Sequence, residues 1–541
     1  MVKKGKRAYS ADFRRPGSGR NQFLEHEQGA LSLNPDARVR MALVFPNVYG
    51  VGMASVGFQT VYYAFNQHPE VRCERVFAQG FDRDKEICTF ESNTPIRQCD
   101  VIAFTLAFEL DIPNVLNVLV QSKLSPLRKE RSQNDPIILM GGVVAGLNPS
   151  PLLPFMDGLL VGEGEGLFYE LGELFYQAKM NRDSRDHVLE KISRLPGFLV
   201  PGLNADVTRR VLPSLDQTEA FTPIITPKSH FKDMFVVEVG RGCKRGCYFC
   251  AAQHLYEPFR TRSRESILNT IATHNPGAKR IGLESAGLSD YPDLIPLLDD
   301  LIQLNYQVSF SSIRADKVTP ELLERVVAHH VKSFTIAPEA GNEALRRRIG
   351  KGITQNKLMQ AVDAVSKYAV DVLKLYFLIG LPSETEEDVA SIGELIREMA
   401  LCFQQSGKRK QIRVSVNAFI PKPFTEFQWA PMDTKDSLKA KRKQIESSIK
   451  SLPNVELTSK SDRLELMQGV LAMGDETVGL ALLDHIVSGR SWNQCLNEHH
   501  VDINHLCWEG KSFETPLPWS MIKDENDPVV LWKRYQSCLG K

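Results

Sequence analysis

The chain has 541 residues, which is too long for one hydrophobic core and indicates about three to four domains, or fewer large ones. Hydrophobic residues make up 43% and charged residues 24%, and the formal net charge of +1 gives no electrostatic case for a nucleic acid or a membrane as partner. No uninterrupted apolar run is long enough to span a bilayer. The basic N-terminus lacks the apolar core of a signal peptide. We therefore expect a cytoplasmic protein with reduced thiols.

The predicted elements divide the chain into five regions. We expect a flexible arm over 1–37, because this stretch is rich in Arg, Lys, Gly and Ser. An α/β domain follows over 38–185, a proline-broken linker over 186–230, a second α/β domain over 231–432, and a mostly helical region over 433–541. Strand-like runs of the first domain alternate with helical patterns, which predicts a Rossmann-like parallel sheet. These runs are 41–45, 100–106, 136–140 and 158–161.

The second α/β domain shows a more regular alternation, in which a helical pattern follows each strand-like run. The predicted strands are 234–240, 280–284, 307–312, 333–339, 372–380 and 413–419. Six strand–helix repeats predict a partial (β/α)6 barrel, a relative of the eight-stranded barrel whose catalytic groups lie at the carboxyl ends of the strands.

A cysteine cluster follows the first predicted barrel strand. The stretch RGCKRGCYFC carries the spacing C-x-x-x-C-x-x-C through Cys243, Cys247 and Cys250. Gly242 and Gly246 allow the chain to turn tightly around a bulky object, and Lys244 and Arg245 could stabilise thiolates or a negatively charged cluster. A structural zinc site would need a fourth ligand, which His254 could supply. An electron-transfer cluster is normally closed by four cysteines, whereas three leave one iron open to a small molecule.

The motif, with Tyr248 and Phe249 before its last cysteine, resembles that of the radical S-adenosylmethionine superfamily. This resemblance implies a [4Fe–4S] cluster on the three cysteines, whose free iron chelates the amino and carboxylate groups of S-adenosylmethionine. An electron from the reduced cluster then cleaves the sulfonium, and the resulting 5′-deoxyadenosyl radical abstracts a hydrogen atom from a substrate. Phe249 would lie beside the adenine.

The same resemblance implies cofactor contacts at successive strand ends. Glu284 and Ser285 follow the second strand, where the family meets the methionyl amino group. After the third strand, Ser312 or Arg314 would meet the methionyl carboxylate, for which an arginine fork is suited. The alternative for Arg314 is an ordinary surface salt bridge.

Two further stretches resemble family segments. In IAPEAGNEALRRRIGKGIT, Glu339 would hold a hydroxyl or amine of the cofactor; its alternative is to cap the helix that begins near Asn342. In FLIGLPSETEED, Ile379 would line the adenine and Gly380 would allow close backbone approach. The alternative for this stretch is a plain loop with Ser383 capping the next helix.

The first domain resembles the cobalamin-binding domain often fused ahead of this barrel. Gly141 and Gly142 follow a strand and would let the backbone approach a corrin or its tail. Where that domain carries D-x-H-x-x-G, this chain reads Asn47, Tyr49 and Gly52, so the metal-binding histidine is missing. Either cobalamin binds without a protein histidine, or the domain is structural or substrate-binding.

The resemblance extends over roughly 40–525 to a group of such fused proteins and implies a radical enzyme of unknown substrate. It would catalyse methyl transfer if cobalamin binds and another radical modification if it does not. The alternatives are a methylthiotransferase, whose family takes a second cluster on three N-terminal cysteines (here Cys73, Cys88 and Cys99 are the nearest candidates), and a non-catalytic iron–sulfur or zinc scaffold or sensor. As partners we expect a reducing donor such as flavodoxin or ferredoxin, no membrane, and no indicated nucleic acid; the basic run RTRSRE (260–265) is expected to be a solvated face rather than a phosphate contact.

Overall fold

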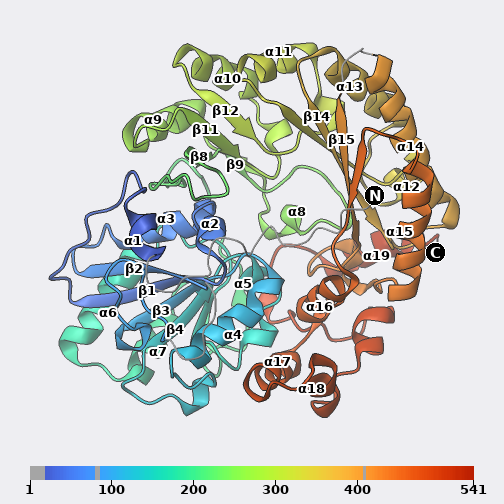
Figure 1. The fold of residues 1–541 in the computed structure, drawn as a ribbon. Coiled ribbons are helices and arrows are strands. Elements are labelled where there is room, and N and C mark those ends of the chain that lie inside the picture. Colours follow the sequence, from blue (N-terminus) through green and yellow to red (C-terminus); the bar gives the residue numbers. More distant parts are fainter. Residues whose placement is uncertain (1–18, 79–85, 406–409, 541) are drawn as a thin grey trace.

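A computed structural model describes residues 19–78, 86–405 and 410–540. It shows two α/β units side by side, with a group of C-terminal helices packed against both (Figure 1). None of the described helices combines the length and apolarity that crossing a bilayer requires.

The first unit is built on a six-stranded sheet of order β2-β1-β3-β4-β5-β6, parallel except for β6. Its strands are β1 (Val39–Phe45), β2 (Val71–Phe77), β3 (Val101–Thr105), β4 (Ile137–Gly141), β5 (Gly158–Leu160) and β6 (Phe198–Leu199). Its helices are α1 (Gly19–Leu24), α2 (Tyr49–Gly52), α3 (Val56–Phe65), α4 (Ile112–Gln121), α5 (Val143–Leu147), α6 (Phe168–Asn181) and α7 (Arg185–Ser193). The four strands predicted for this domain are confirmed, and the central ones are buried on both faces, as parallel strands usually are.

Strand β2 escaped prediction because it carries charged residues that are nonetheless buried. Arg75 is 1% exposed and pairs with Glu27 at 2.8 Å and with Glu91 at 2.5 Å. Glu27 also accepts a hydrogen bond from the Tyr49 hydroxyl at 2.5 Å. Residues 19–37, expected to belong to a flexible arm, are therefore fixed to the first sheet, because the Glu27 carboxylate in this segment pairs with the buried Arg75 guanidinium. The rest of the predicted arm, 1–18, lies outside the described residues.

The second unit contains two parallel sheets, ordered β12-β11-β8 and β13-β14-β15-β16. Their strands are β8 (Met234–Glu238), β11 (Arg280–Glu284), β12 (Gln307–Phe310), β13 (Ser333–Glu339), β14 (Val372–Ile379), β15 (Gln411–Ala418) and β16 (Val455–Thr458). All six predicted strands are confirmed, and β16 is added at the far edge. Strands β12 and β13 belong to separate sheets, although the Ile313 amide donates to the Thr335 carbonyl at 3.3 Å between them.

Helices follow the strands of the second unit and cover its outer face (Figure 1). They are α9 (Arg264–His274), α10 (Leu294–Gln303), α11 (Pro320–Ala328), α12 (Glu343–Arg348), α13 (Gln355–Lys367) and α14 (Glu386–Gln405). Helix α8 (Ala251–Leu255) lies instead between the two units, where it packs against α5 (Figure 1). Burial alternates along β14, where Leu373, Leu375 and Phe377 are fully buried and Tyr376 is 40% exposed. The apolar face thus packs under the helices, while the other face of the sheet is polar and open.

The segment expected as a linker is folded. It contains most of α7, strand β6 and strand β7 (Val207–Thr208), and the amide of Thr222 donates to the carbonyl of Val236 at 3.0 Å. The C-terminal region contains α15 (Lys435–Ile449), α16 (Asp462–Met473), α17 (Glu476–Ser488), α18 (Trp492–Glu498), β17 (Ile522–Lys523), which pairs with β7, and α19 (Pro528–Cys538). It bridges both units, since the buried Asn148 side chain donates to the carbonyls of Ala472 and Gly474.

Candidate functional site

The cysteine motif forms the loop between strands β8 and β9 (Gly240–Arg241) and helix α8. Gly242 has φ +85°, and a Cβ there would lie 2.5 Å from the Tyr256 carbonyl oxygen, so only glycine fits. The Tyr248 amide donates to the Ile349 carbonyl at 3.0 Å, and the Phe427 amide donates to the Tyr248 carbonyl at 3.1 Å. The loop is therefore held from two other segments of the chain.

The three thiols are unpaired, with Cys247 buried and Cys243 and Cys250 half-buried. Burial raises the pKa of Cys247 to about 12, the neighbouring Cys250 and Glu339 add to the rise, and Lys351 opposes it. Within the described residues, no three His, Cys, Asp or Glu side chains converge to hold a single metal ion. A four-iron cluster does not need three side chains at one metal ion, because each cysteine binds a different iron.

His254 does not complete a zinc site. Its ring is 2% exposed, with Nδ1 2.8 Å from Asn526 Oδ1 and Nε2 3.3 Å from Glu426 Oε2. Both ring nitrogens are thus engaged, and the buried Glu426 also pairs at 3.0 Å with Arg534, which is 48% exposed. The donor set that remains, three cysteines on one loop, fits a cluster with one open iron better than tetrahedral zinc.

Glu339 faces this loop in a strained conformation. It ends β13 with φ +66°, beyond a register shift between Ile336 and Glu339, and positive φ is uncommon for residues other than glycine. Its carboxylate lies 3.0 Å from Lys351 Nζ. Asn342 caps α12 by accepting a hydrogen bond from the Leu345 amide, so the capping alternative for Glu339 is wrong. Lys351, in the G-K-G run, was not singled out from the sequence.

The cationic groups near the thiols are in part those expected. The hydrogen bond to Asp290, and with less weight the charge of Cys243, raise the pKa of Arg245, whereas Lys244 Nζ lies 5.2 Å from the centroid of the Phe259 ring. Lys351 and Arg314, which were not expected in this role, also face the thiols and lower the pKa of Cys247 against the effect of burial. A negatively charged cluster would be stabilised by these two cations.

Of the two residues expected near the methionyl carboxylate, Ser312 is exposed. Arg314 is half-buried and directs Nε to Asp316 Oδ1 at 2.9 Å, so its fork is already occupied by a carboxylate. The salt-bridge alternative for Arg314 is the arrangement that the structure shows.

Phe249 packs on an apolar cluster that includes Ala340, Leu378 and Leu381. Ile379 is fully buried in the core under the helices and faces away from this cluster, so the prediction that its side chain lines the adenine is wrong. Because neighbouring residues of a strand point to opposite faces, Leu378 is the residue that faces the apolar cluster around Phe249. Gly380 has φ +77°, and its amide donates to Glu384 Oε2 at 2.7 Å. Thr385, rather than Ser383, caps α14, by accepting from the Asp388 amide.

A cavity of about 420 Å³ lies between the two units. The carboxyl ends of β3, β4 and β5 and helix α3 line it from one side, and residues 238, 240–242 and 284–286 line it from the other. Ligands of open α/β sheets bind outside the carboxyl ends of the strands, and a volume of this size suits a drug-sized molecule. The cavity reaches Gly242 and therefore abuts the cysteine loop.

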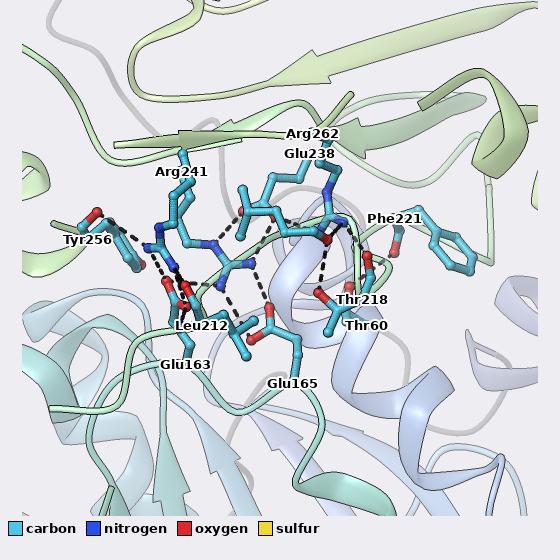
Figure 2. A network of polar contacts seen from close by, with 12 residues as sticks. Thr60, Glu163, Glu165, Leu212, Thr218, Phe221, Glu238, Arg241, Tyr256 and Arg262 are labelled. Atoms are coloured by element: carbon cyan, nitrogen blue, oxygen red, sulfur yellow. Dashed lines mark hydrogen bonds and ion pairs between the residues drawn. The ribbon is translucent and has the colours of Figure 1, made fainter. Parts of the chain in front are cut away.

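Charged side chains close one side of this cavity (Figure 2). Arg241 pairs with Glu165 at 2.6 Å, with Glu238 at 2.8 Å and with Glu163 at 3.3 Å. Glu163 also pairs with Arg260 at 2.6 Å, and Glu238 pairs with Arg262 at 2.9 Å. Two of these carboxylates come from the first unit and all three guanidiniums from the second, so the network ties the units together. Arg260 and Arg262, expected on a solvated face, are buried here.

Glu284 lies beside this network without joining it. It ends β11 in register with Glu238 of β8, and its exposed side chain lines the cavity. Burial among protein groups, and then the charge of Glu238, raise its pKa to about 7, against the opposing effect of Arg241. The charged side chains that affect the Cys247 thiol are those of Lys351, Glu339 and Arg314. Glu284 thus faces the cavity. Ser285 is buried, and its hydroxyl accepts from the Gly287 amide.

The residues expected near a corrin separate into two groups. Gly141 and Gly142 line the cavity, and Gly142, with φ +100°, leaves no room for a side chain against Leu106. Asn47, Tyr49 and Gly52 do not line it: Asn47 donates to Asp111, and Tyr49 is fully buried against aromatic rings. Among the described residues no histidine lines the cavity, so these residues do not fit a cobalamin that takes a cobalt ligand from the protein.

The N-terminal cysteines lie away from this cavity. Cys73 is the third residue of β2 and Cys99 precedes β3, so both are near the amino ends of the parallel strands, and neither they nor Cys88 line the cavity. A second cluster built on them would face the opposite edge of the sheet from the cysteine loop. This placement counts against the methylthiotransferase alternative.

Two family models match the chain. One described as "Radical SAM proteins, N-terminal" matches residues 57–201, and one described as "Radical SAM superfamily" matches 237–396. Together they cover more than half of the chain. The three-cysteine loop lies in the second of these segments. The chain therefore belongs to the radical S-adenosylmethionine superfamily, whose members use a [4Fe–4S] cluster and S-adenosylmethionine, and it is a radical S-adenosylmethionine enzyme.

Among individual proteins, the chain is 28% identical over 451 residues to an uncharacterized protein of Methanocaldococcus jannaschii, covering 81% of this chain and 89% of that one. It is 23% identical over 199 residues to the ribosomal protein uS12 methylthiotransferase of Caldanaerobacter subterraneus, covering 34% of this chain and 45% of that enzyme.

Among solved structures, the methyltransferase TsrM of Kitasatospora setae aligns with a TM-score of 0.47 at 12% identity, over 70% of this chain and 73% of TsrM. The cobalamin-dependent enzyme OxsB aligns with a TM-score of 0.46 at 16% identity, over 66% of this chain and 51% of OxsB.

Proposed function

We propose that this enzyme cleaves S-adenosylmethionine reductively on a [4Fe–4S] cluster held by Cys243, Cys247 and Cys250, and that the resulting radical acts on a molecule in the cavity between the units. The observation that carries the proposal is the loop itself: three thiols on a backbone fixed at Gly242 and Tyr248, and no fourth ligand from His254. In this proposal the two parallel sheets of the second unit form one open partial barrel, and the first sheet is a Rossmann-like lid over its carboxyl end.

The chain's own residues then have separate tasks. Lys351 and Arg314 place positive charge beside the thiols, and Glu339, fixed by Lys351, offers a carboxylate to a hydroxyl or amine of the cofactor. Phe249, with Leu378 and Leu381, provides an apolar wall for the adenine. Gly380 follows this wall, with its amide bound to Glu384 Oε2. When bound, the cluster supplies the electron for the cleavage, which an external donor such as flavodoxin or ferredoxin would replenish.

The test is anaerobic reconstitution with iron and sulfide, followed by incubation with S-adenosylmethionine and dithionite. We expect iron near four per chain and formation of 5′-deoxyadenosine and methionine. An intact cluster that forms no 5′-deoxyadenosine would refute the proposal. A colourless protein that contains zinc and no iron would show the scaffold alternative instead.

Methyl transfer with cobalamin held without a protein ligand is the second candidate. Gly141 and Gly142 favour it, because they bring backbone to the cavity at the carboxyl ends of the strands. Cobalt analysis of protein produced with cobalamin in the medium tests it. Iron near four per chain without cobalt would exclude this route.

A further inference from the structure

The cavity between the units has an unbalanced charge. The carboxylates of Glu163, Glu165, Glu238 and Glu284 line it together with the guanidinium of Arg241. Arg260 and Arg262 pair with Glu163 and Glu238 without lining the cavity, and Arg210 donates to the Glu163 carbonyl oxygen. Every one of these carboxylates except that of Glu284 has an ion-pair partner. In the described part of the chain, the Glu284 side chain has no hydrogen bond or ion pair at all.

A carboxylate without a partner beside like charge is unfavourable, and a protein ordinarily supplies a cation or loses the charge. Glu238, the register partner of Glu284 on the adjacent strand, is already satisfied by Arg241 and Arg262. Burial among protein groups, and then the charge of Glu238, raise the pKa of Glu284 to about 7, and Arg241 opposes this rise only in part. The missing positive charge would therefore come from a ligand.

The rest of the cavity is largely apolar. Its walls include the side chains of Val61, Phe65, Leu139, Leu160, Phe168 and Leu255. Such a lining, with one polar group to fix orientation, is the usual composition of a site for a drug-sized molecule. Gly57 of α3 also lines the cavity, and a Cβ built on it meets no atom within 4 Å, so space remains open there.

The charged end of the cavity touches the cysteine loop. Gly240, Arg241 and Gly242 line it, and a Cβ on Gly287, three residues after Glu284, would lie 3.2 Å from the Gly242 carbonyl oxygen and 3.5 Å from the Cys243 Cα. A molecule whose cation reaches Glu284 is thus oriented with that end toward the loop.

From these observations we infer that the cavity binds a largely apolar, drug-sized molecule that carries one protonated amine, and that Glu284 receives the amine. This inference rests on the proposed function in so far as the molecule is the substrate of the radical. It does not depend on that function for binding itself. It also assigns Glu284 to the cavity ligand in place of the methionyl amino group of S-adenosylmethionine.

The test uses three amines with neutral counterparts of matched shape: phenethylamine and phenethyl alcohol, tryptamine and tryptophol, octylamine and octanol. Binding to the anaerobic, iron-loaded protein is measured by isothermal titration calorimetry. We expect at least one amine to bind about tenfold more tightly than its alcohol, since one tenfold step corresponds to about 1.4 kcal/mol and a charge-assisted contact reaches that value. Glu284→Gln should remove this preference and leave the affinity of the alcohol unchanged.

A second variant tests the location. Gly57→Leu fills the open space and should abolish binding of both the amine and the alcohol, while Gly57→Ala should weaken it less. The melting temperature should not fall in either variant, because a side chain replaces glycine within a helix and meets no neighbour.

Several outcomes would overturn the inference. They are equal affinities of all three amines and their alcohols, an amine preference that survives Glu284→Gln, undiminished binding to Gly57→Leu, or stoichiometric cobalamin in the cavity. Failure of the proposed function is recognised separately, as an amine preference that persists in a protein that forms no 5′-deoxyadenosine. Loss of S-adenosylmethionine affinity in Glu284→Gln, with amine binding unchanged, would return Glu284 to the cofactor.

Discussion

Arg241→Met should destabilise the protein strongly, because Arg241 holds carboxylates from both units. Its side chain is 10% exposed and contacts three glutamates. After the substitution Glu163 keeps Arg260 and Glu238 keeps Arg262, whereas Glu165 loses its ion-pair partner. Leaving one partner of a buried ion pair uncompensated costs about 3–5 kcal/mol.

The assay is equilibrium unfolding in urea, which leaves ionic strength unchanged. Adding Glu165→Gln to Arg241→Met should recover a large part of the loss, since it removes the uncompensated charge. Arg490→Leu is the matched control: Arg490 also pairs with two acidic residues but is 40% exposed, so its loss should cost less than about 1 kcal/mol. Equal effects of the Arg241 and Arg490 substitutions, or no recovery in the double variant, would refute the reasoning.

The remaining predictions concern the cluster, its neighbours and the cavity. Cys247→Ala should lose iron and 5′-deoxyadenosine formation together, whereas Cys495→Ala, at a buried cysteine of α18, should keep the iron; a stable four-iron cluster in Cys247→Ala would contradict the assignment. Lys351→Met should lower the rate of 5′-deoxyadenosine formation by about 10²-fold, because Glu339 loses its only ion pair in the described residues and the thiols lose a nearby cation. Lys351→Arg should recover part of this rate. An unchanged rate in Lys351→Met would contradict this role. The raised pKa of Glu284 predicts that its protonated form favours the fold, so this stabilisation is complete below pH about 4.5 and is lost as pH rises through about 7. Glu284→Gln should therefore raise the melting temperature at pH 8 and leave it unchanged at pH 4, unlike Glu446→Gln at an exposed helix position, and no difference between the two pH values would contradict the unbalanced charge.

Much of the fold could be predicted from periodicity. The strands β11, β14 and β15 are runs whose apolar residues alternate with polar ones or fill both faces, and each is followed by a helical pattern, so local sequence fixes their type. Strand β2 was missed for the opposite reason. Its arginines and glutamates look solvated in isolation, and the contacts that Arg75 makes with Glu27, 48 positions away, and with Glu91 account for its burial.

The candidate site, like the fold, could be predicted from the sequence only in part. Cys243, Cys247 and Cys250 are close in sequence, so the spacing alone indicates a cluster with an open iron, and the loop glycines mark where the backbone turns. Ile379 was placed on the wrong face because neighbouring residues of a strand point in opposite directions, and the register of β14 decides which of them faces the cofactor side. The predicted contact of Arg314 with the methionyl carboxylate requires a free guanidinium, whereas Asp316, two residues away, already binds that guanidinium.

Local sequence is enough to predict the three-cysteine spacing, the series of strands and helices that carries it, and the superfamily to which both belong. Which charges meet depends on how segments that are far apart in the chain pack together. Glu163 and Glu165 lie 76 or more positions from the arginines with which they form ion pairs, and Glu284 becomes distinctive only because those arginines are already occupied. Ion pairing depends on distance in space, and the docking of the two units sets that distance.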